Sequence, residues 1–285
     1  MASRELLRKK QTKAEFPIWN EALCAIDLVL LHASPVCYGL GIPHGEGSAV
    51  VVIPGFLGSD RYLIQLNSWL ERIGYRPYRS GIAPNAECPN LLIQNHLNAI
   101  IDRAVTETGR KVDLIGHSLG GIMARSLASQ RPDDIASIIT LASPFRGNTY
   151  HHTVHRAAEV VRKYILKEHG SEVRPACYTH RCTCDFLNYL RCNVPPSVMV
   201  TALYTRDDGI VDWQSCRTGD SDVDVEVTGT HVGLVFNAAV YTVIANRLAQ
   251  VQSRTNCNQE DRRHRDVVNV FKLRQASLTA VFLLS

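Results

Sequence analysis

The feature that most constrains the fold is an alternation of short apolar runs with amphipathic helix patterns between residues 49 and 141. The first run, 49–54, is almost continuously β-branched, as in a strand buried on both faces of a parallel sheet. The later strand patterns cover 76–79, a run from 111 that ends at Ser118, and 135–141, and the helix patterns cover 61–73, 90–106 and 119–130. Because strands that alternate with helices pair in parallel, we expect an α/β fold with helices on both faces of a mostly parallel sheet.

The second half of the chain interrupts and then resumes this pattern. Regularity fails in 146–196, where histidine and cysteine are frequent and one helix is expected at 154–167. Strands are expected again at 197–204 and 222–227, followed by a helix at 235–248. At 285 residues the chain is long enough for one large core, which we place at 49–253 with a Cys-rich cap insertion at 146–196. Residues 1–48 form an N-terminal helical extension, and 254–285 form a C-terminal tail of unknown role.

The strand that ends at Ser118 runs into a helix through Gly116-His117-Ser118-Leu119-Gly120-Gly121. Glycines on both sides keep the turn narrow, so that Ser118 can stand exposed above the sheet in a strained conformation. The helix that starts at Leu119 supplies backbone N–H groups at the same place. The pattern therefore predicts a nucleophile, although a glycine-rich turn without chemistry would share it.

A serine nucleophile needs a base and an acid, which should follow strands at the carboxyl edge of the sheet. His231 directly follows the last expected strand and precedes a helix, which makes it the candidate base. Asp208 precedes Gly209 in the loop after 197–204 and is the favoured acid, with Asp207 and Asp212 as alternatives. The chain order serine, aspartate, histidine is that of the nucleophile-elbow hydrolases.

These motifs together resemble the α/β-hydrolases of the bacterial lipase and esterase type. The resemblance spans about residues 49–248 and rests on 54–56, 116–121, 142–147, 205–211 and 229–234. It implies ester hydrolysis through an acyl-enzyme on Ser118, with no cofactor and a small-molecule or lipid ester as substrate. It also implies an oxyanion hole made by the backbone N–H groups of Phe56 and Leu119. Pro54-Gly55 departs from the His-Gly pair common in lipases, but the amide of Phe56 is retained.

The sequence leaves the acyl acceptor and the acyl chain open. A thioesterase or acyltransferase would use the same three side chains, and a binding protein could reuse the scaffold without chemistry. The insertion is polar and basic in places, which favours short to medium acyl chains.

A dense group of cysteines in the insertion has three explanations. Disulfides that staple the insertion, a structural zinc site and ordinary buried thiols would each account for it. The residues are Cys177, His180, Cys182, Cys184, Cys192 and, beyond the insertion, Cys216. Zinc is disfavoured because the spacing lacks paired Cys-x2-Cys knuckles, so no metal is expected. The remaining cysteines, including Cys88, are expected to be ordinary, and His151, His152 and His155 to lie on a solvated helix.

Charge and hydropathy bear on partners and location. The 31 basic and 27 acidic residues are mixed along the chain, which argues against a nucleic-acid partner. The apolar segment 22–36 is too short to span a bilayer, so it packs on the core or lies on a membrane surface. The first thirteen residues lack the pattern of a secretory signal, so a cytoplasmic protein is expected, with a secreted or periplasmic one as the alternative if the cysteines pair. The oligomeric state is not predicted.

Overall fold

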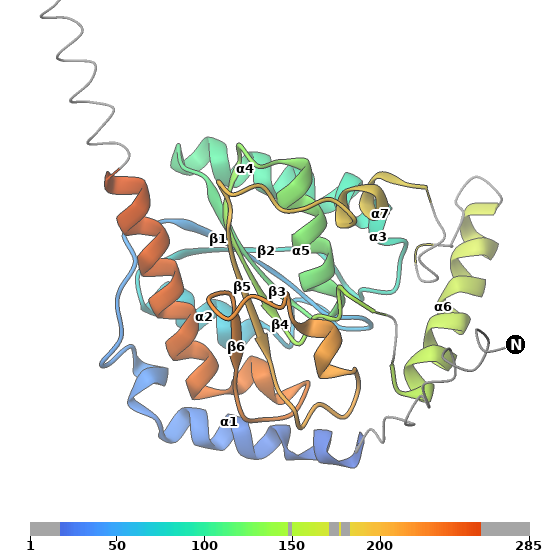
Figure 1. Ribbon diagram of the computed structural model, residues 1–285, viewed down its shortest axis with the longest axis horizontal. Helices are drawn as coiled ribbons and strands as arrows, with labels where there is room; N and C mark the ends of the chain where they lie inside the picture. The colour runs from blue at the N-terminus through green and yellow to red at the C-terminus, as the bar shows by residue number, and fades with distance from the viewer. Residues whose placement is uncertain (1–17, 148–149, 171–176, 178–182, 258–285) are drawn as a thin grey trace, which may run out of the picture.

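The computed structural model describes residues 18–147, 150–170, 177 and 183–257, which form a sheet covered by helices on both faces (Figure 1). The strands are β1 (Ala49–Ile53), β2 (Arg76–Arg79), β3 (Val112–His117), β4 (Ile135–Leu141), β5 (Met199–Tyr204) and β6 (Asp224–Glu226). The longer helices are α1 (Cys24–Ala33), α2 (Ile64–Arg72), α4 (Asn98–Thr108), α5 (Leu119–Gln130), α6 (His152–His169) and one over 238–257. The short elements are η1 (Ile18–Leu23), η2 (Pro35–Tyr38), α3 (Pro89–Leu92), η3 (Ile93–Leu97), α7 (Asp185–Leu190), η6 (Trp213–Cys216) and η7 (Gly233–Phe236).

All six strands are parallel, in the order β2-β1-β3-β4-β5-β6. After β2 the chain returns to the other side of β1 to form β3, so the strand order reverses between β1 and β3. In open parallel sheets, ligands bind beyond the carboxyl ends of the strands at such a reversal. The loop after β1 and the turn after β3, which ends at Ser118, lie at this point.

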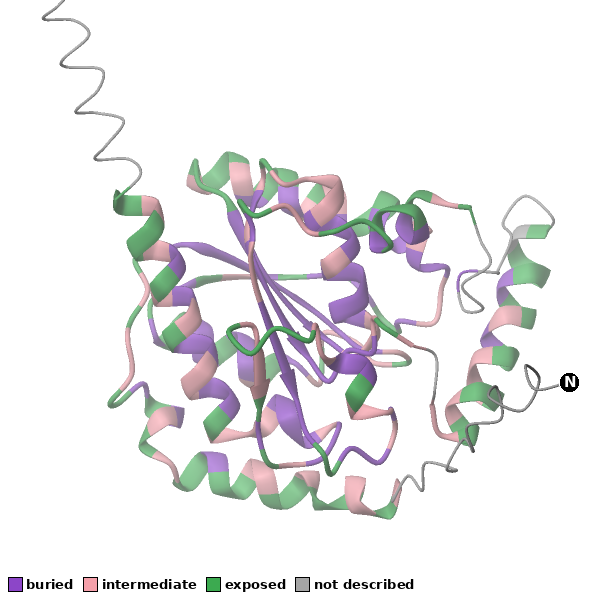
Figure 2. Cartoon of the chain, viewed as in Figure 1, coloured by how far each residue is buried: buried purple, intermediate pink, exposed green. Residues whose placement is uncertain are grey.

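Two apolar layers sandwich the sheet. Side chains from alternate positions of β1 enter opposite layers, as the period of a strand requires: Val51 faces α4, α5 and α7, whereas Val52 faces α1, α2 and the helix over 238–257. The inner strands β1, β3 and β4 are buried along almost their whole length, which explains their continuous apolar runs in the sequence, whereas the outer strands β2 and β6 are partly exposed (Figure 2).

The predicted α/β class is confirmed, and several predicted boundaries shift. The helix expected at 90–106 spans α3, a single π turn (η3) and α4. The boundary predicted at residue 253 falls inside a helix that continues to 257, so 254–257 are not part of a separate tail. Residues 258–285 lie outside the described part of the chain.

The insertion at 146–196 is not one cap. Its helix α6 stands at the carboxyl edge of the sheet, whereas α7 packs on α5 as part of the core layer (Figure 1). Phe186 and Leu187 of α7 are buried, and the Ser126 hydroxyl of α5 donates a hydrogen bond to the Phe186 carbonyl. In the described part of the insertion, α6 therefore lies over the candidate site and α7 belongs to the core layer, from which Phe186 also reaches the pocket.

The N-terminal extension packs on the core through a small part of its surface. Leu31 is the buried side chain of α1, and Cys37 is buried in the following η2. The backbone carbonyls of η2 accept hydrogen bonds from Trp69 and Arg72 of α2. No helix in the described ranges is both long and apolar enough to cross a membrane.

Candidate active site

Ser118 occupies a sharp turn between β3 and α5. Its φ of 51° and ψ of −118° lie outside the regions that residues with a Cβ normally adopt, so the turn is strained. The Ser118 N–H donates to the Leu141 carbonyl and its own carbonyl accepts from the Gly121 N–H, which fixes the turn on both sides. Ser118, predicted to be exposed, is half-buried at the start of α5, where helical N–H groups lack intrahelical partners.

Glycine is required on both sides of Ser118. A Cβ on Gly116 would lie 2.4 Å from the carbonyl oxygen of Gly120, and a Cβ on Gly120 would lie 2.2 Å from the carbonyl oxygen of Ile53. These distances are far below van der Waals contact. The helix can therefore start directly above β1 and β3 only because both positions lack a side chain.

Asp208 and His231 form a buried hydrogen-bonded pair. The Nδ1 atom of His231 lies 2.7 Å from Oδ2 of Asp208, and the two side chains are 3% and 1% exposed. The other oxygen of Asp208 accepts the backbone N–H groups of Ile210 and Val211, each at 2.8 Å. Because a carboxylate only accepts hydrogen bonds, Nδ1 carries the proton and Nε2 is left as the basic nitrogen.

The structure separates Asp208 from the two alternative aspartates. Asp207 is exposed, and Asp212 accepts the N–H of Gln214 at the start of η6. Only Asp208 of the three is paired with His231 in the described part of the chain.

The pKa of His231 reflects two opposed effects. Burial disfavours the imidazolium, but the charge and hydrogen bond of Asp208, together with the charge of Glu21, outweigh it and raise the pKa above 6.5. The neutral form, which can accept a proton, therefore predominates only above this raised value.

Glu21 joins the two loops that carry Asp208 and His231. Its Oε1 accepts the backbone N–H groups of Gly209 and His231, both at 3.1 Å, and its Oε2 accepts the N–H of Val232 at 2.8 Å. A residue of η1 thus binds loops that lie about 190 and 210 positions later in the sequence. Glu21 was not predicted from the sequence, because nothing in its local pattern points to such distant backbone groups.

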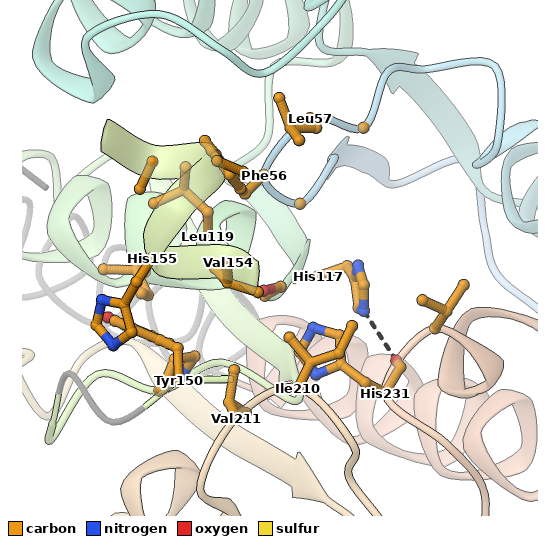
Figure 3. Close-up of a pocket in the computed structure, with 18 of the residues that line it drawn as sticks. Phe56, Leu57, His117, Leu119, Tyr150, Val154, His155, Ile210, Val211 and His231 are labelled. Atoms are coloured by element: carbon orange, nitrogen blue, oxygen red, sulfur yellow. Dashed lines mark hydrogen bonds between the residues drawn. The ribbon is translucent and has the colours of Figure 1, made fainter. Parts of the chain in front are cut away.

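A chain of hydrogen bonds connects the loop after β1 to the His231 loop through His117. The Gly55 N–H donates to the Tyr62 hydroxyl at 2.7 Å, which lies 2.9 Å from Nδ1 of His117, and Nε2 of His117 lies 3.0 Å from the His231 carbonyl (Figure 3). A carbonyl can only accept, so Nε2 of His117 is protonated and its Nδ1 accepts the Tyr62 hydroxyl proton. Burial, with the charge of His231 second, lowers the pKa of His117 to about 3, which keeps this neutral tautomer.

The predicted oxyanion donors, Phe56 and Leu119, come from the loop after β1 and from the start of α5. Both line the pocket that contains Ser118 (Figure 3). The loop that holds Phe56 is fixed by buried Asn85, whose side-chain amide donates to the Pro54 carbonyl and whose backbone carbonyl accepts the Leu57 N–H, both at 2.8 Å. Tyr62 and Asn85 were also not predicted from the sequence, because no motif marks the groups that they contact.

A pocket of about 570 Å³ opens beside Ser118 and His231. One wall comes from α6, whose Val154, Ala157 and Ala158 face the cavity, and the opposite wall includes Leu57 and Ile122. The lining is mostly apolar even though the sequence of the insertion is polar, because α6 is amphipathic and turns its apolar side inward. The α6 start is tied to the Asp208 loop by the His151 N–H, which donates to the Ile210 carbonyl at 2.8 Å.

The cysteines divide into separate places. The Sγ atom of Cys177 lies 3.3 Å from that of Cys184 and 3.8 Å from that of Cys88, so Cys88, expected to be ordinary, joins the group. Cys192 is exposed, and Cys216 is buried behind the Asp208 loop; the described cysteines are free thiols. His180 and Cys182 lie outside the described residues. Within the described ranges no three or more His, Cys, Asp or Glu side chains are grouped as metal ligands.

Comparisons with known proteins agree with this architecture. Residues 85–172 match the model of the PGAP1-like alpha/beta domain family. The chain resembles a triacylglycerol lipase of Burkholderia plantarii, with 29% identity over 41% of this chain and 35% of the lipase, and one of Pseudarthrobacter phenanthrenivorans, with 29% identity over 35% of this chain and 34% of the lipase. It thus spans about a third of the length of each of these relatives. A solved structure from work on carboxylesterases of Nitrososphaera gargenis superposes over 74% of this chain and 93% of that one, with a TM-score of 0.50 and 16% identity.

The chain has the α/β-hydrolase fold. The fold class expected from the motifs around Ser118 is thereby confirmed. In an α/β-hydrolase fold the sheet places the turn after β3 and the loops after β5 and β6 at one edge, and this chain brings Ser118, Asp208 and His231 to that edge.

Proposed function

We propose that the protein is a serine hydrolase that cleaves carboxylic esters through an acyl-enzyme on Ser118. The observation that carries this proposal is the buried Asp208–His231 pair at 2.7 Å, in the same pocket as a serine held at positive φ. A surface histidine would not need a buried carboxylate, and a turn without chemistry would not need a strained serine.

Each group has a role that follows from its geometry. Nε2 of His231 takes the Ser118 proton as the hydroxyl oxygen attacks the ester carbonyl, and then gives it to the departing alcohol oxygen. Asp208 holds the tautomer and stabilises the imidazolium. The amides of Phe56 and Leu119 receive the negative oxygen of the tetrahedral intermediate, a contribution of about 3 kcal/mol for each donor. Water, activated by His231, then releases the acid and restores Ser118.

The pocket favours an apolar acyl group. A volume of about 570 Å³ suits a ligand of drug size, and the pocket residues of α5 and α6 are mostly apolar. We infer that short to medium acyl esters enter this pocket and that lipid esters are substrates where one chain fits it. Both curated relatives are named as triacylglycerol lipases, which supports a lipid ester.

A fluorophosphonate probe and a set of aryl esters test the proposal. Wild-type protein should be labelled at Ser118 and should hydrolyse aryl esters, with activity rising from acetyl towards medium chains. Ser118→Ala should lose both properties, whereas Ser129→Ala, which changes a serine on the far part of α5, should keep them. Full activity in Ser118→Ala would refute the assignment.

The acyl acceptor is tested separately. Product analysis with an alcohol or a thiol present distinguishes hydrolysis from acyl transfer, since a thioesterase or acyltransferase would use the same acyl-enzyme. The proposal predicts the free acid as the main product. A transferred acyl group as the main product would replace hydrolysis with acyl transfer but would leave the role of Ser118 intact.

A further inference from the structure

The Glu21 carboxylate lies where two loops meet. Gly209 belongs to the loop after β5, and His231 and Val232 belong to the loop after β6, yet their three N–H groups all donate to this one side chain. Gly209 directly follows Asp208, so the carboxylate contacts the backbone beside both members of the Asp208–His231 pair. Hydrogen bonds to an ionised acceptor are about twice as strong as neutral ones.

We propose that Glu21 is a positioning residue that holds the Asp208 and His231 loops in one arrangement and places its negative charge beside the imidazole. This inference rests on the proposed function, because it assigns Glu21 a part in the work of His231. It gives the N-terminal segment, which supplies no reacting group, a direct effect on the base. The loops have one further direct link, a hydrogen bond of 2.6 Å from the Thr205 hydroxyl to the Gly229 carbonyl.

Titratable groups reach His231 from several elements. Asp208 follows β5, His117 ends β3, and Glu21 lies in η1. Asp27 of α1 packs against Gly233, two residues from His231. Asp208 and Glu21 are the carboxylates whose charges favour the imidazolium, so neutralising Glu21 should leave His231 neutral down to a lower pH.

Glu21→Gln and Glu21→Ala test the two parts of the proposal. The glutamine keeps an oxygen acceptor but removes the charge, so the acid limb of kcat/KM should move to lower pH with a small change in the maximum. The alanine removes both acceptor oxygens and with them all three hydrogen bonds. The kcat should therefore fall roughly 10- to 100-fold with little change in KM, because small displacements of a base have large effects. Asp27→Asn is the matched control, since it neutralises a nearby carboxylate on the same segment but leaves the hydrogen bonds from the N–H groups of Gly209, His231 and Val232 to Glu21 in place.

An imidazole NMR titration of His231 in the Ser118→Ala background gives a readout that does not depend on activity. It should show the same downward displacement for Glu21→Gln and none for Asp27→Asn. If Glu21→Gln titrates like wild type, and Glu21→Ala lowers only the melting temperature, Glu21 is merely structural and the inference fails. If wild type has no esterase activity but the NMR displacement is found, the positioning role stands and the proposed function fails.

A different observation concerns the outer side of the same segment. Large apolar residues with exposed side chains recur along η1 and α1 with spacings of four, three and four. They are Trp19 (75% exposed), Leu23 (47%), Ile26 (54%) and Leu30 (59%), with Val29 (67%) beside them. A patch of this kind marks an interaction surface. The two acidic residues of η1 and α1, Glu21 and Asp27, face the Asp208 and His231 loops and not the solvent-exposed side.

We infer that this face binds an anionic lipid bilayer surface. Three features favour a bilayer over a protein partner: the face is a single helix wide, it carries a tryptophan at one end, and the preceding sequence is basic. Residues 1–17, which lie outside the described part of the chain, contain five basic and two acidic residues. The face also begins beside the pocket, because Ile18 lines the pocket and Trp19 is exposed.

Vesicle flotation tests this inference. Wild type should float with vesicles of phosphatidylcholine and phosphatidylglycerol at least tenfold more than with phosphatidylcholine alone. The triple variant Trp19→Ser/Ile26→Ser/Leu30→Ser should lose binding to both, and Lys9→Glu/Lys10→Glu should lose the preference for anionic vesicles. Val160→Ser/Tyr164→Ser changes exposed apolar residues of α6 and is the matched control.

Two outcomes would overturn the bilayer inference. Unchanged flotation of the triple variant would show that another surface binds lipid. Light scattering that finds a wild-type dimer, and a monomer for the triple variant, would assign the face to a second copy of the chain. The side chains substituted in the triple variant and in the α6 control are exposed, so these variants should keep the wild-type melting temperature.

Discussion

Replacing Tyr62 by phenylalanine would break the hydrogen-bond chain between the two sides of the active site. The hydroxyl accepts the Gly55 N–H and donates to Nδ1 of His117, so the variant leaves one donor and one acceptor without partners. Gly55 and Tyr62 line the pocket, where water can reach the amide, but His117 is almost fully buried. We therefore assign most of the loss to His117, at about 1–3 kcal/mol for a buried unsatisfied group.

This loss converts to a measurable change in melting temperature. For a domain of this size 1 kcal/mol corresponds to roughly 2–4 °C, so a loss of about 2 kcal/mol should lower the melting temperature by roughly 4–8 °C. Scanning calorimetry of the purified protein measures it. Esterase activity should also fall, because Gly55 adjoins the proposed oxyanion donor Phe56.

Tyr241→Phe is the matched control for this experiment. Tyr241 is fully buried against Trp69, and its hydroxyl has no hydrogen-bond partner among the described residues. Removing that hydroxyl should be neutral or slightly stabilising, since it relieves a desolvated polar group. If Tyr62→Phe melts within about 1 °C of wild type, or if Tyr241→Phe loses more stability than Tyr62→Phe, the assigned hydrogen-bond chain is wrong.

Three further predictions follow from the geometry. Burial, opposed by a hydrogen bond from Ser137, raises the pKa of Asp113 to about 7, so the free energy of unfolding of the wild type should fall as the pH rises from about 4 to 7. In urea unfolding, Asp113→Asn should abolish this fall and be a few kcal/mol more stable than the wild type at pH 8. The same dependence of stability on pH in both proteins would contradict this prediction. Asp208→Asn should lower kcat by about 10⁴-fold, measured on an aryl ester, because the tautomer of His231 is no longer fixed; a loss below tenfold would exclude Asp208 as the acid. Ser118→Gly should raise the free energy of unfolding by about 1 kcal/mol while abolishing fluorophosphonate labelling, since glycine relieves the φ of 51°; a destabilised variant would argue against strain.

The helices and strands around Ser118 could be predicted because the signals that set their limits lie within a few residues of each limit. The strand β4 and the helix α5 have the predicted limits, since apolar periodicity and Pro132 act within a few residues. Asp208 and His231 were predicted because topology carries strand ends to one edge of the sheet. That argument needs only the order of the elements.

The remaining parts of the site depend on contacts that produce no periodic pattern in the sequence. Glu21, Tyr62 and Asn85 bind backbone N–H or carbonyl groups, and a backbone group is the same at every position of a sequence. Helix α7 is too short to show a helical period, so its packing on α5 was taken for part of the cap. The inward apolar side of α6 was hidden in a segment whose average composition is polar.

The residues of α6 that line the pocket lie in a different segment of the chain from the residues proposed to react. The reacting groups come from turns that the sheet fixes, whereas α6 belongs to one excursion between β4 and α7. Substitutions on the inner side of α6 should therefore change which esters are accepted without altering the rate-determining groups. The exception is its first turn, where the His151–Ile210 hydrogen bond joins it to the Asp208 loop. To change the substrate range of the proposed activity, Val154, Ala157 and Ala158 are the positions to randomise, with residues 150 and 151 left unchanged.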